Sequence, residues 1–196
     1  MAAGILNRCA LPQGNAAHAE PAPVFDVTEV YEAHYRYVWR CLRSLGVREA
    51  QLDDALQDVF IVVQRRLPEF DGQVALSTWL YAIALRVARK ARERARREAL
   101  KADADATGDD APAPSPDAEA TLHHNQRLHL ARAALEALDD DKREVFVLSH
   151  IEQMSAPEMA GVLGVPLNTV YSRLRAARQA FATEVQRLSS RHRSAP

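Results

Sequence analysis

Apolar residues recur at three- and four-residue steps over most of the chain, and no stretch alternates with the two-residue period of a strand. In the first half of the chain the pattern starts near Phe25, stops at Gly46, and breaks again at the loop around Gly72. Ser77 and Thr78 are suited to cap a later helix. The pattern predicts helices over residues 25–46, 51–67 and 77–101.

The second half of the chain shows the same period. One apolar stripe runs from Leu128 to Leu138 and another from Val145 to Ile151. Two shorter patterns follow, at residues 155–163 and 168–188. The sequence therefore predicts an all-α protein.

Two segments lack the helical period. Residues 1–23 are rich in Ala and Pro and predict a disordered tail, and residues 102–121 hold six Asp or Glu and no Lys or Arg. This acidic, Pro- and Ala-rich composition predicts a flexible linker. It divides the folded chain into helical domains at residues 24–101 and 122–190. Residues 24–101 carry a net charge of +3, and residues 122–196 carry +2. The overall charge of −1 hides this asymmetry.

Composition also narrows the compartment. The two cysteines, Cys9 and Cys41, form no disulfide framework, which favours a reducing environment. No apolar run approaches the ~20 residues of a membrane span, and the N-terminus lacks the basic start of a signal peptide. We expect a cytoplasmic protein without membrane insertion.

The strongest local signal is a helix-turn-helix at residues 155–181. Ser155 and Glu158 have the spacing of a capping box, and Gly164 is suited to end the first helix. Asn168 is predicted to cap the second helix, while Val170 and Leu174 anchor it. The alternative is a helical hairpin with a solvated basic face.

The second of these helices is the candidate DNA reader. Such a helix lies in the major groove, where Arg is the commonest specific reader of guanine. With Asn168 at its start, the outward positions predicted to contact DNA are Thr169, Tyr171, Ser172, Arg173, Arg175 and Arg178.

Other chemistry finds little support. His123, His124 and His129 lack the closed ligand set of a zinc site, and the acidic run at residues 139–141 fits a helix start. No catalytic triad, phosphate loop or nucleotide fingerprint is present. We predict no catalytic residue, no metal and no cofactor.

Residues 52–97 carry a second motif. It comprises an acidic pair, then Gln57-Asp58-Val59-Phe60, then Phe70-Asp71-Gly72, then Thr78-Trp79-Leu80-Tyr81 and a basic helix. This order resembles region 2 of sigma-70 family RNA polymerase sigma factors of the extracytoplasmic-function (ECF) group, and residues 128–181 resemble region 4. The resemblance implies an alternative sigma factor that binds core polymerase and directs promoter recognition and DNA melting.

The resemblance also implies binding residues. The family's second helix docks on the β′ clamp of polymerase, which implies a polymerase-binding set of Asp54, Gln57, Asp58 and Phe60. The loop and helix that follow match the reader of the promoter −10 element, where aromatic groups hold unpaired bases and basic groups track phosphates. The implied −10 residues are Phe70, Trp79, Tyr81, Arg86, Arg89 and Lys90, while the helix-turn-helix reads the −35 element.

Ala82, Arg86 and Tyr171 depart from the family pattern near base-reading positions, so the promoter sequence stays open. The acidic linker resembles the segment that threads the polymerase active-site cleft, and a plain spacer is the alternative. Promoter DNA, core polymerase and an anti-sigma factor are the implied partners. Two other hypotheses are a DNA-binding regulator that does not join polymerase and a metal-dependent nuclease.

Overall fold

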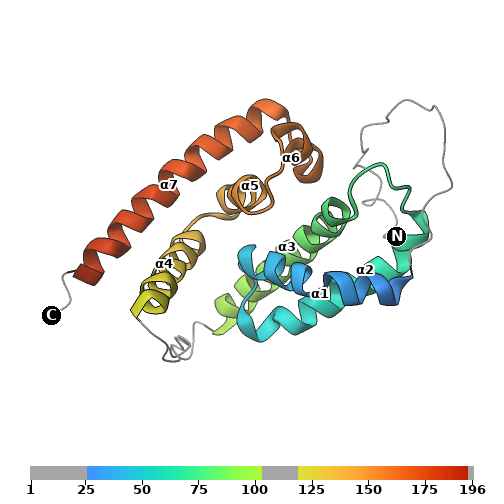
Figure 1. The fold of residues 1–196 in the computed structure, drawn as a ribbon, viewed down its shortest axis with the longest axis horizontal. Helices are drawn as coiled ribbons and strands as arrows, with labels where there is room; N and C mark the ends of the chain where they lie inside the picture. The colour runs from blue at the N-terminus through green and yellow to red at the C-terminus, as the bar shows by residue number, and fades with distance from the viewer. Residues whose placement is uncertain (1–25, 103–118, 194–196) are drawn as a thin grey trace.

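The computed structural model describes residues 26–102 and 119–193, and every regular element in these ranges is helical (Figure 1). The all-α prediction is thereby confirmed. The predicted tail at residues 1–23 and most of the predicted linker lie outside the described residues. The α-helices are α1 (Val27–Ser44), α2 (Leu52–Arg66), α3 (Leu76–Ala102), α4 (Glu119–Glu136), α5 (Asp140–His150), α6 (Ala156–Leu163) and α7 (Leu167–Arg193). Because α4 begins at Glu119, the last residues of the predicted linker are helical.

Helices α1, α2 and α3 pack on one another and form the first helical unit (Figure 1). The Asp26 carboxylate caps α1 by accepting a hydrogen bond from the Thr28 N–H at 3.1 Å. Gly46 has a φ of 82° and ends α1, as predicted. The unit is held together by apolar side chains that are buried completely, among them Val38, Leu42, Val59, Val63 and Leu80.

The start of α3 differs from the prediction. The helix begins at Leu76, and the Trp79 N–H donates to the Ala75 carbonyl at 3.1 Å. Ser77 and Thr78 therefore lie inside the first turn and do not cap it. The chain enters the helix directly from the loop, because Leu76 already packs against the core.

Helices α4 to α7 form the second unit. The Asp139 carboxylate caps α5 by accepting from the Lys142 N–H at 2.9 Å. The predicted capping box is present at α6, where Glu158 accepts from the backbone N–H and the hydroxyl of Ser155 at 2.8 and 2.7 Å. Gly164 ends α6 with a φ of 69°.

The predicted cap of α7 is wrong. The helix begins at Leu167, and the N–H groups of Thr169 and Val170 donate to the Pro166 carbonyl at 2.9 and 3.2 Å. Asn168 therefore lies in the first turn. Proline has a fixed φ near −65° that allows the helix to follow directly, so no side-chain cap is required at Asn168.

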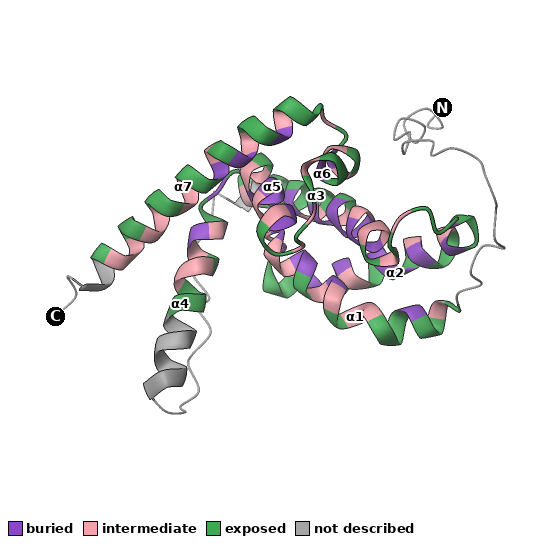
Figure 2. Ribbon diagram, turned by 45° about the horizontal axis from the view of Figure 1, so that its top comes forward, coloured by how far each residue is buried: buried purple, intermediate pink, exposed green. Residues whose placement is uncertain are grey.

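The two units share one hydrophobic core. Val145, Leu148 and Met159 of the second unit belong to the same buried cluster as Leu42 and Tyr81 of the first. In Figure 2 the buried residues concentrate along α3 and α5 and thin out toward the ends of α4 and α7. We call this packing of α5 and α6 against α1 and α3 the closed arrangement. The sequence predicted two tethered domains and did not predict their contact.

Candidate nucleic-acid interface

The helix-turn-helix consists of α6 and α7. Val170 and Leu174 are 0% and 7% exposed and fix α7 to the core, as predicted. The residues around these two anchors form a polar face of α7. Of the residues predicted to contact DNA, Thr169 and Arg173 are half-buried, and Asn168, Tyr171, Ser172, Arg175 and Arg178 are exposed.

Intramolecular contacts already engage part of this face. Arg173 pairs with Asp141 of α5 at 2.8 Å, and Arg178 Nε lies 3.4 Å from His150 Nε2. The Ser172 hydroxyl donates to the Thr169 carbonyl at 3.0 Å. Arg175 makes no ion pair within the described ranges. The face thus contains both engaged and available cations.

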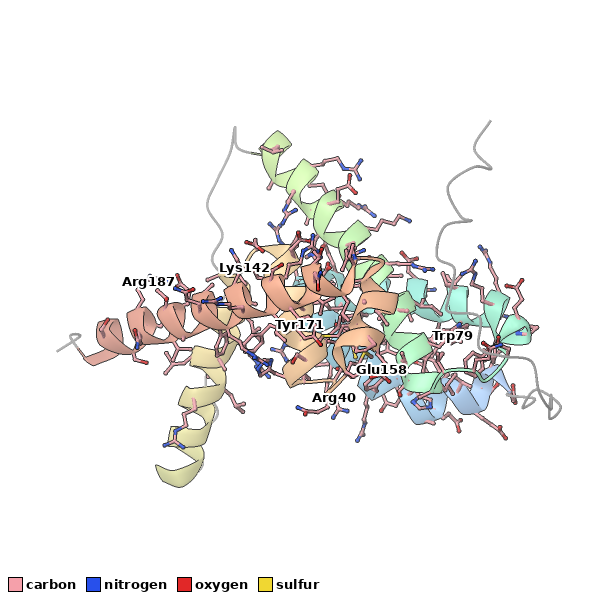
Figure 3. All side chains as sticks on the ribbon, turned by 90° about the horizontal axis from the view of Figure 1, so that it is seen from above. Arg40, Trp79, Lys142, Glu158, Tyr171 and Arg187 are labelled. Carbon is pink, nitrogen blue, oxygen red and sulfur yellow. The ribbon has the colours of Figure 1, made fainter. Side chains whose placement is uncertain are left out.

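A second basic surface lies on α3. Arg86, Arg89 and Lys90 are exposed, and Figure 3 shows nitrogen-tipped side chains along the part of α3 that extends beyond the rest of the molecule. Arg89 donates two hydrogen bonds to Glu144 at 3.0 and 2.6 Å. These bonds raise the pKa of Arg89. Arg86 and Lys90 have no ion pair among the described residues.

The aromatic residues predicted to hold −10 bases differ in how deeply they are buried. Trp79 is half-buried, and its ring centroid lies 5.1 Å from that of Phe70. Tyr81 is 0% exposed and Phe70 is 6% exposed. Because both side chains are buried in the core, the prediction that these two residues contact bases directly is corrected. In Figure 3 Trp79 and Tyr171 lie well apart, so the two candidate DNA surfaces are separate.

The predicted polymerase-binding residues lie on α2. Asp54, Gln57 and Asp58 are exposed along one face of the helix. Phe60 is 9% exposed, and its ring packs edge-on against that of Tyr31 with 4.7 Å between the ring centroids. It therefore supports this surface from the core side, and the prediction that it contacts polymerase directly is corrected. Beside it runs a groove of about 650 Å³, lined by Val27, Thr28, Tyr31, Asp53, Leu56, Gln57, Phe60, Ile61 and Gln64.

A cluster of buried charges joins the two units, and sequence reasoning missed it. Glu144 is 2% exposed and accepts from Arg89 and, at 2.7 Å, from Arg92 Nη2. Arg92 is 7% exposed, lies 3.3 Å from Asp140, and donates to the Leu45 carbonyl. The only sequence signal was the pairing of an acidic α5 segment with an Arg-rich α3 segment.

Arg143 holds the same region from the α5 side. Its guanidinium donates to the carbonyls of Leu135 and Glu136, the last two residues of α4, and to that of Leu138 just after the helix, at 2.8 to 2.9 Å. Burial lowers its pKa. This residue links α4 to α5 where the backbone carbonyls of α4 lack helical partners.

Two kinds of site are absent from residues 26–102 and 119–193. No group of three His, Cys, Asp or Glu side chains there is arranged to hold a metal ion. No helix there is long and apolar enough to cross a membrane.

An α-helical chain with a helix-turn-helix and a separate Arg-rich helix defines a DNA-binding transcription protein. Residues 30–98 match the family described as sigma-70 region 2, and residues 128–181 match sigma-70, region 4. The chain belongs to the sigma-70 family, in its ECF group: it is an alternative RNA polymerase sigma factor that directs transcription initiation.

Similar proteins span most of the chain. RNA polymerase sigma factor CnrH of Cupriavidus metallidurans is 35% identical over 69% of this chain and 74% of its own. The ECF RNA polymerase sigma-E factor of Escherichia coli K12 is 29% identical over 80% of this chain and 85% of its own.

Solved structures agree in fold. The sigma factor RpoE in complex with the anti-sigma factor NepR from Bartonella quintana has a TM-score of 0.66 at 20% identity, over 83% of this chain and 98% of that one. CnrH in complex with the cytosolic domain of CnrY has a TM-score of 0.57 at 26% identity, over 82% and 87% of the two chains.

Proposed function

We propose that the three surfaces divide the work of initiation among them. The exposed face of α2 (Asp54, Gln57 and Asp58) binds the β′ clamp of core polymerase. The α3 surface (Trp79, Arg86, Arg89 and Lys90) binds the −10 element. The α7 face (Asn168, Thr169, Tyr171, Ser172, Arg173, Arg175 and Arg178) binds the −35 element.

The observation that carries this proposal is the separation of two cationic surfaces on one chain. Cations that are exposed and have no carboxylate partner can neutralise phosphates, and Arg86, Lys90 and Arg175 meet this condition within the described ranges. Arg175 lies in the first half of α7, the part of a recognition helix that reaches base edges. Half-buried Trp79 offers a partly open ring face for stacking an unpaired base.

The polymerase contact is argued from charge and shape. Asp54 and Asp58 form an acidic stripe one helical turn apart, and the apolar groove runs beside them. An acidic stripe with an apolar border complements a basic, amphipathic partner surface. Buried Phe60, which packs on Tyr31 of α1, and half-buried Leu56 hold this part of α2 in place.

The remaining partners follow from the family. Two similar structures contain anti-sigma factors, and we infer that this protein too is regulated by one. It acts in the cytoplasm, where polymerase and promoter DNA are, and it has no catalytic activity, metal or cofactor of its own.

Run-off transcription with core polymerase and the full chain on genomic fragments tests the proposal and reveals the promoter. Asp58→Arg is expected to weaken core binding at least about tenfold by placing a cation against a basic partner. Glu32→Arg, the same charge reversal on an exposed position of α1, is the matched control. Equal core affinity for the two variants would contradict the assignment of α2.

The DNA assignment is tested on the promoter so obtained. Arg175→Ala is expected to cost about 1–3 kcal/mol of binding at one position of the upstream element. A footprint over that element that does not change would rule out α7 as the reader.

A further inference from the structure

An imidazole is held in place where α5 packs against α7 in the second unit (Figure 1). His150 is the last residue of α5, and its ring stacks on that of Phe146 with 4.3 Å between the centroids and 10° between the planes. Phe146 in turn stacks on Phe181 of α7 at 4.4 Å. The imidazole is thus the outer member of an aromatic stack that crosses from α5 to α7.

The turn after α5 fixes His150 through its backbone as well. The carbonyl of a residue at the end of a helix lacks a helical partner. The His150 carbonyl accepts a hydrogen bond from Gln153 Nε2 at 2.8 Å. Gln153 itself has a φ of 55°, in the left-handed region that few residues other than glycine adopt. Ring and backbone are therefore both held in one position.

The neighbours of the two ring nitrogens determine where the proton lies. Nδ1 lies 3.3 Å from the Phe146 carbonyl oxygen, which can only accept. Nε2 lies 3.4 Å from Arg178 Nε, whose N–H can only donate. Nδ1 therefore carries the proton and Nε2 carries the lone pair, which is one tautomer of the neutral ring. His150 is consequently an acceptor directed at an arginine of α7.

This hydrogen bond engages one edge of the Arg178 guanidinium and leaves another edge available. The N–H groups of Nη1 and Nη2 form the fork that binds two oxygens of a phosphate. Arg178 is exposed, and no carboxylate of the described residues pairs with it. Arg173 differs, since Asp141 compensates its charge at 2.8 Å. A neutral imidazole instead gives Arg178 a direction and leaves its full charge for a ligand.

We propose that His150 is a positioning residue for DNA binding: it holds the Arg178 guanidinium toward a phosphate of the −35 element. The proposal rests on the assignment of α7 to that element. Arg178 lies three residues beyond Arg175, farther from the N-terminal part of the helix that reaches base edges, so a phosphate is its expected partner. A side chain that is already oriented loses less rotamer freedom on binding, which stabilises the complex.

Two variants separate the acceptor from the aromatic stack. His150→Phe keeps a ring against Phe146 and removes the acceptor. His150→Gln removes the ring and keeps an oxygen the same number of bonds from Cβ as Nε2. Positioning predicts that His150→Phe weakens promoter binding about fivefold, the loss of one hydrogen bond to a charged group at this long distance. His150→Gln is expected to stay within about twofold of the wild type, because the acceptor is retained.

The measurement uses the holoenzyme, assembled from core polymerase and the full chain. Fluorescence anisotropy gives its affinity for a labelled duplex that carries the promoter found by run-off transcription. His129→Phe, the same substitution at an exposed position of α4, is the matched control and is expected to bind like the wild type. Circular dichroism checks the helix content and the unfolding midpoint of each variant, and His150→Leu replaces His150→Phe if the latter does not fold.

A double-mutant cycle tests whether His150 acts through Arg178. Arg178→Ala alone is expected to weaken binding about tenfold and to reduce the slope of log K against log[salt] by about 0.9, the value for one phosphate. In the Arg178→Ala background, His150→Phe is expected to cause no further loss, because the guanidinium that it orients is absent. A purely structural role for His150 would weaken binding equally in both backgrounds.

Each outcome decides the proposal. A loss for His150→Phe that disappears in the Arg178→Ala background supports positioning. Unchanged binding for His150→Phe overturns it, as does an equal loss in both backgrounds or a larger loss for His150→Gln than for His150→Phe. If Arg178→Ala changes neither affinity nor salt slope, the assignment of Arg178 to DNA fails as well. If Arg178→Ala weakens binding and His150→Phe does not, the proposed function stands and the positioning role alone is overturned.

Discussion

Individual side chains in this protein are divided between core and surface in ways that their motif does not reveal. Tyr81 and Trp79 belong to one sequence motif, yet Tyr81 is completely buried and Trp79 is half-buried. Two positions along a helix differ by about 200° in direction, so neighbours in a motif face different surroundings. Burial raises the pKa of Tyr81, whose hydroxyl has no hydrogen-bond partner among the residues that the structure describes.

The isolated Tyr81 hydroxyl gives a prediction at this scale. Tyr81→Phe removes a buried polar group that is not satisfied, so the free energy of unfolding is expected to rise by about 1 kcal/mol. Urea denaturation followed by circular dichroism measures it. Tyr37→Phe is the comparison, because its hydroxyl bonds Glu152 at 2.6 Å, and its loss is expected to cost about 1 kcal/mol. A clear loss of stability for Tyr81→Phe would reveal a partner for that hydroxyl.

Single elements follow local rules closely. The capping box of α6 and the left-handed Gly164 at its end were both predicted and are both present. At α7 the same reasoning selected Asn168 as the cap, but the Pro166 carbonyl already accepts the first N–H bonds. Helix starts are therefore predicted well where a side chain makes the cap, and poorly where the backbone alone does so.

The caps of α5 and α6 make stability depend on pH. Hydrogen bonds from Lys142 lower the pKa of Asp139, and those from Ser155 lower the pKa of Glu158. A carboxyl whose pKa is lower in the folded state stabilises the fold above its unfolded pKa, and this stabilisation is lost as the pH falls through the folded value.

Thermal unfolding between pH ~6 and ~3 is thus expected to show a falling midpoint below pH ~4.5. Glu158→Gln is expected to lower the midpoint at pH ~6 and to flatten the dependence on pH. If the variant and the wild type follow parallel curves over this range, the α6 cap does not contribute to acid sensitivity.

At the scale of the whole molecule, the contact between the two units determines which groups are accessible. Cys41 is 1% exposed on α1, and its thiol lies beside Glu152 of the second unit. Burial and the neighbouring carboxylate raise the pKa of this thiol. Both effects suppress the thiolate, which is the reactive form.

The rate at which Cys41 is alkylated therefore reports separation of the two helical units. In a Cys9→Ser background the remaining thiol is expected to react with iodoacetamide far more slowly than free cysteine at pH ~8. Glu152→Gln removes the carboxylate and weakens the contact, so it is expected to accelerate the reaction several-fold. Mass spectrometry of the modified protein measures the rate. An equally slow reaction in this variant would show that α1 shields the thiol by itself.

The sequence by itself determined the helices, the helix-turn-helix and the family, because these depend on local periodicity, caps and motif order. It also placed the exposed candidates on α2 and α7, since the outward positions of an amphipathic helix follow from its buried ones. Only the tertiary structure decided that Phe60, Phe70 and Tyr81 are core residues. It alone paired Glu144 with Arg89 and Arg92, across 55 and 52 positions of the chain. Such pairs depend on how helices separated by a long connection pack, which no local pattern encodes.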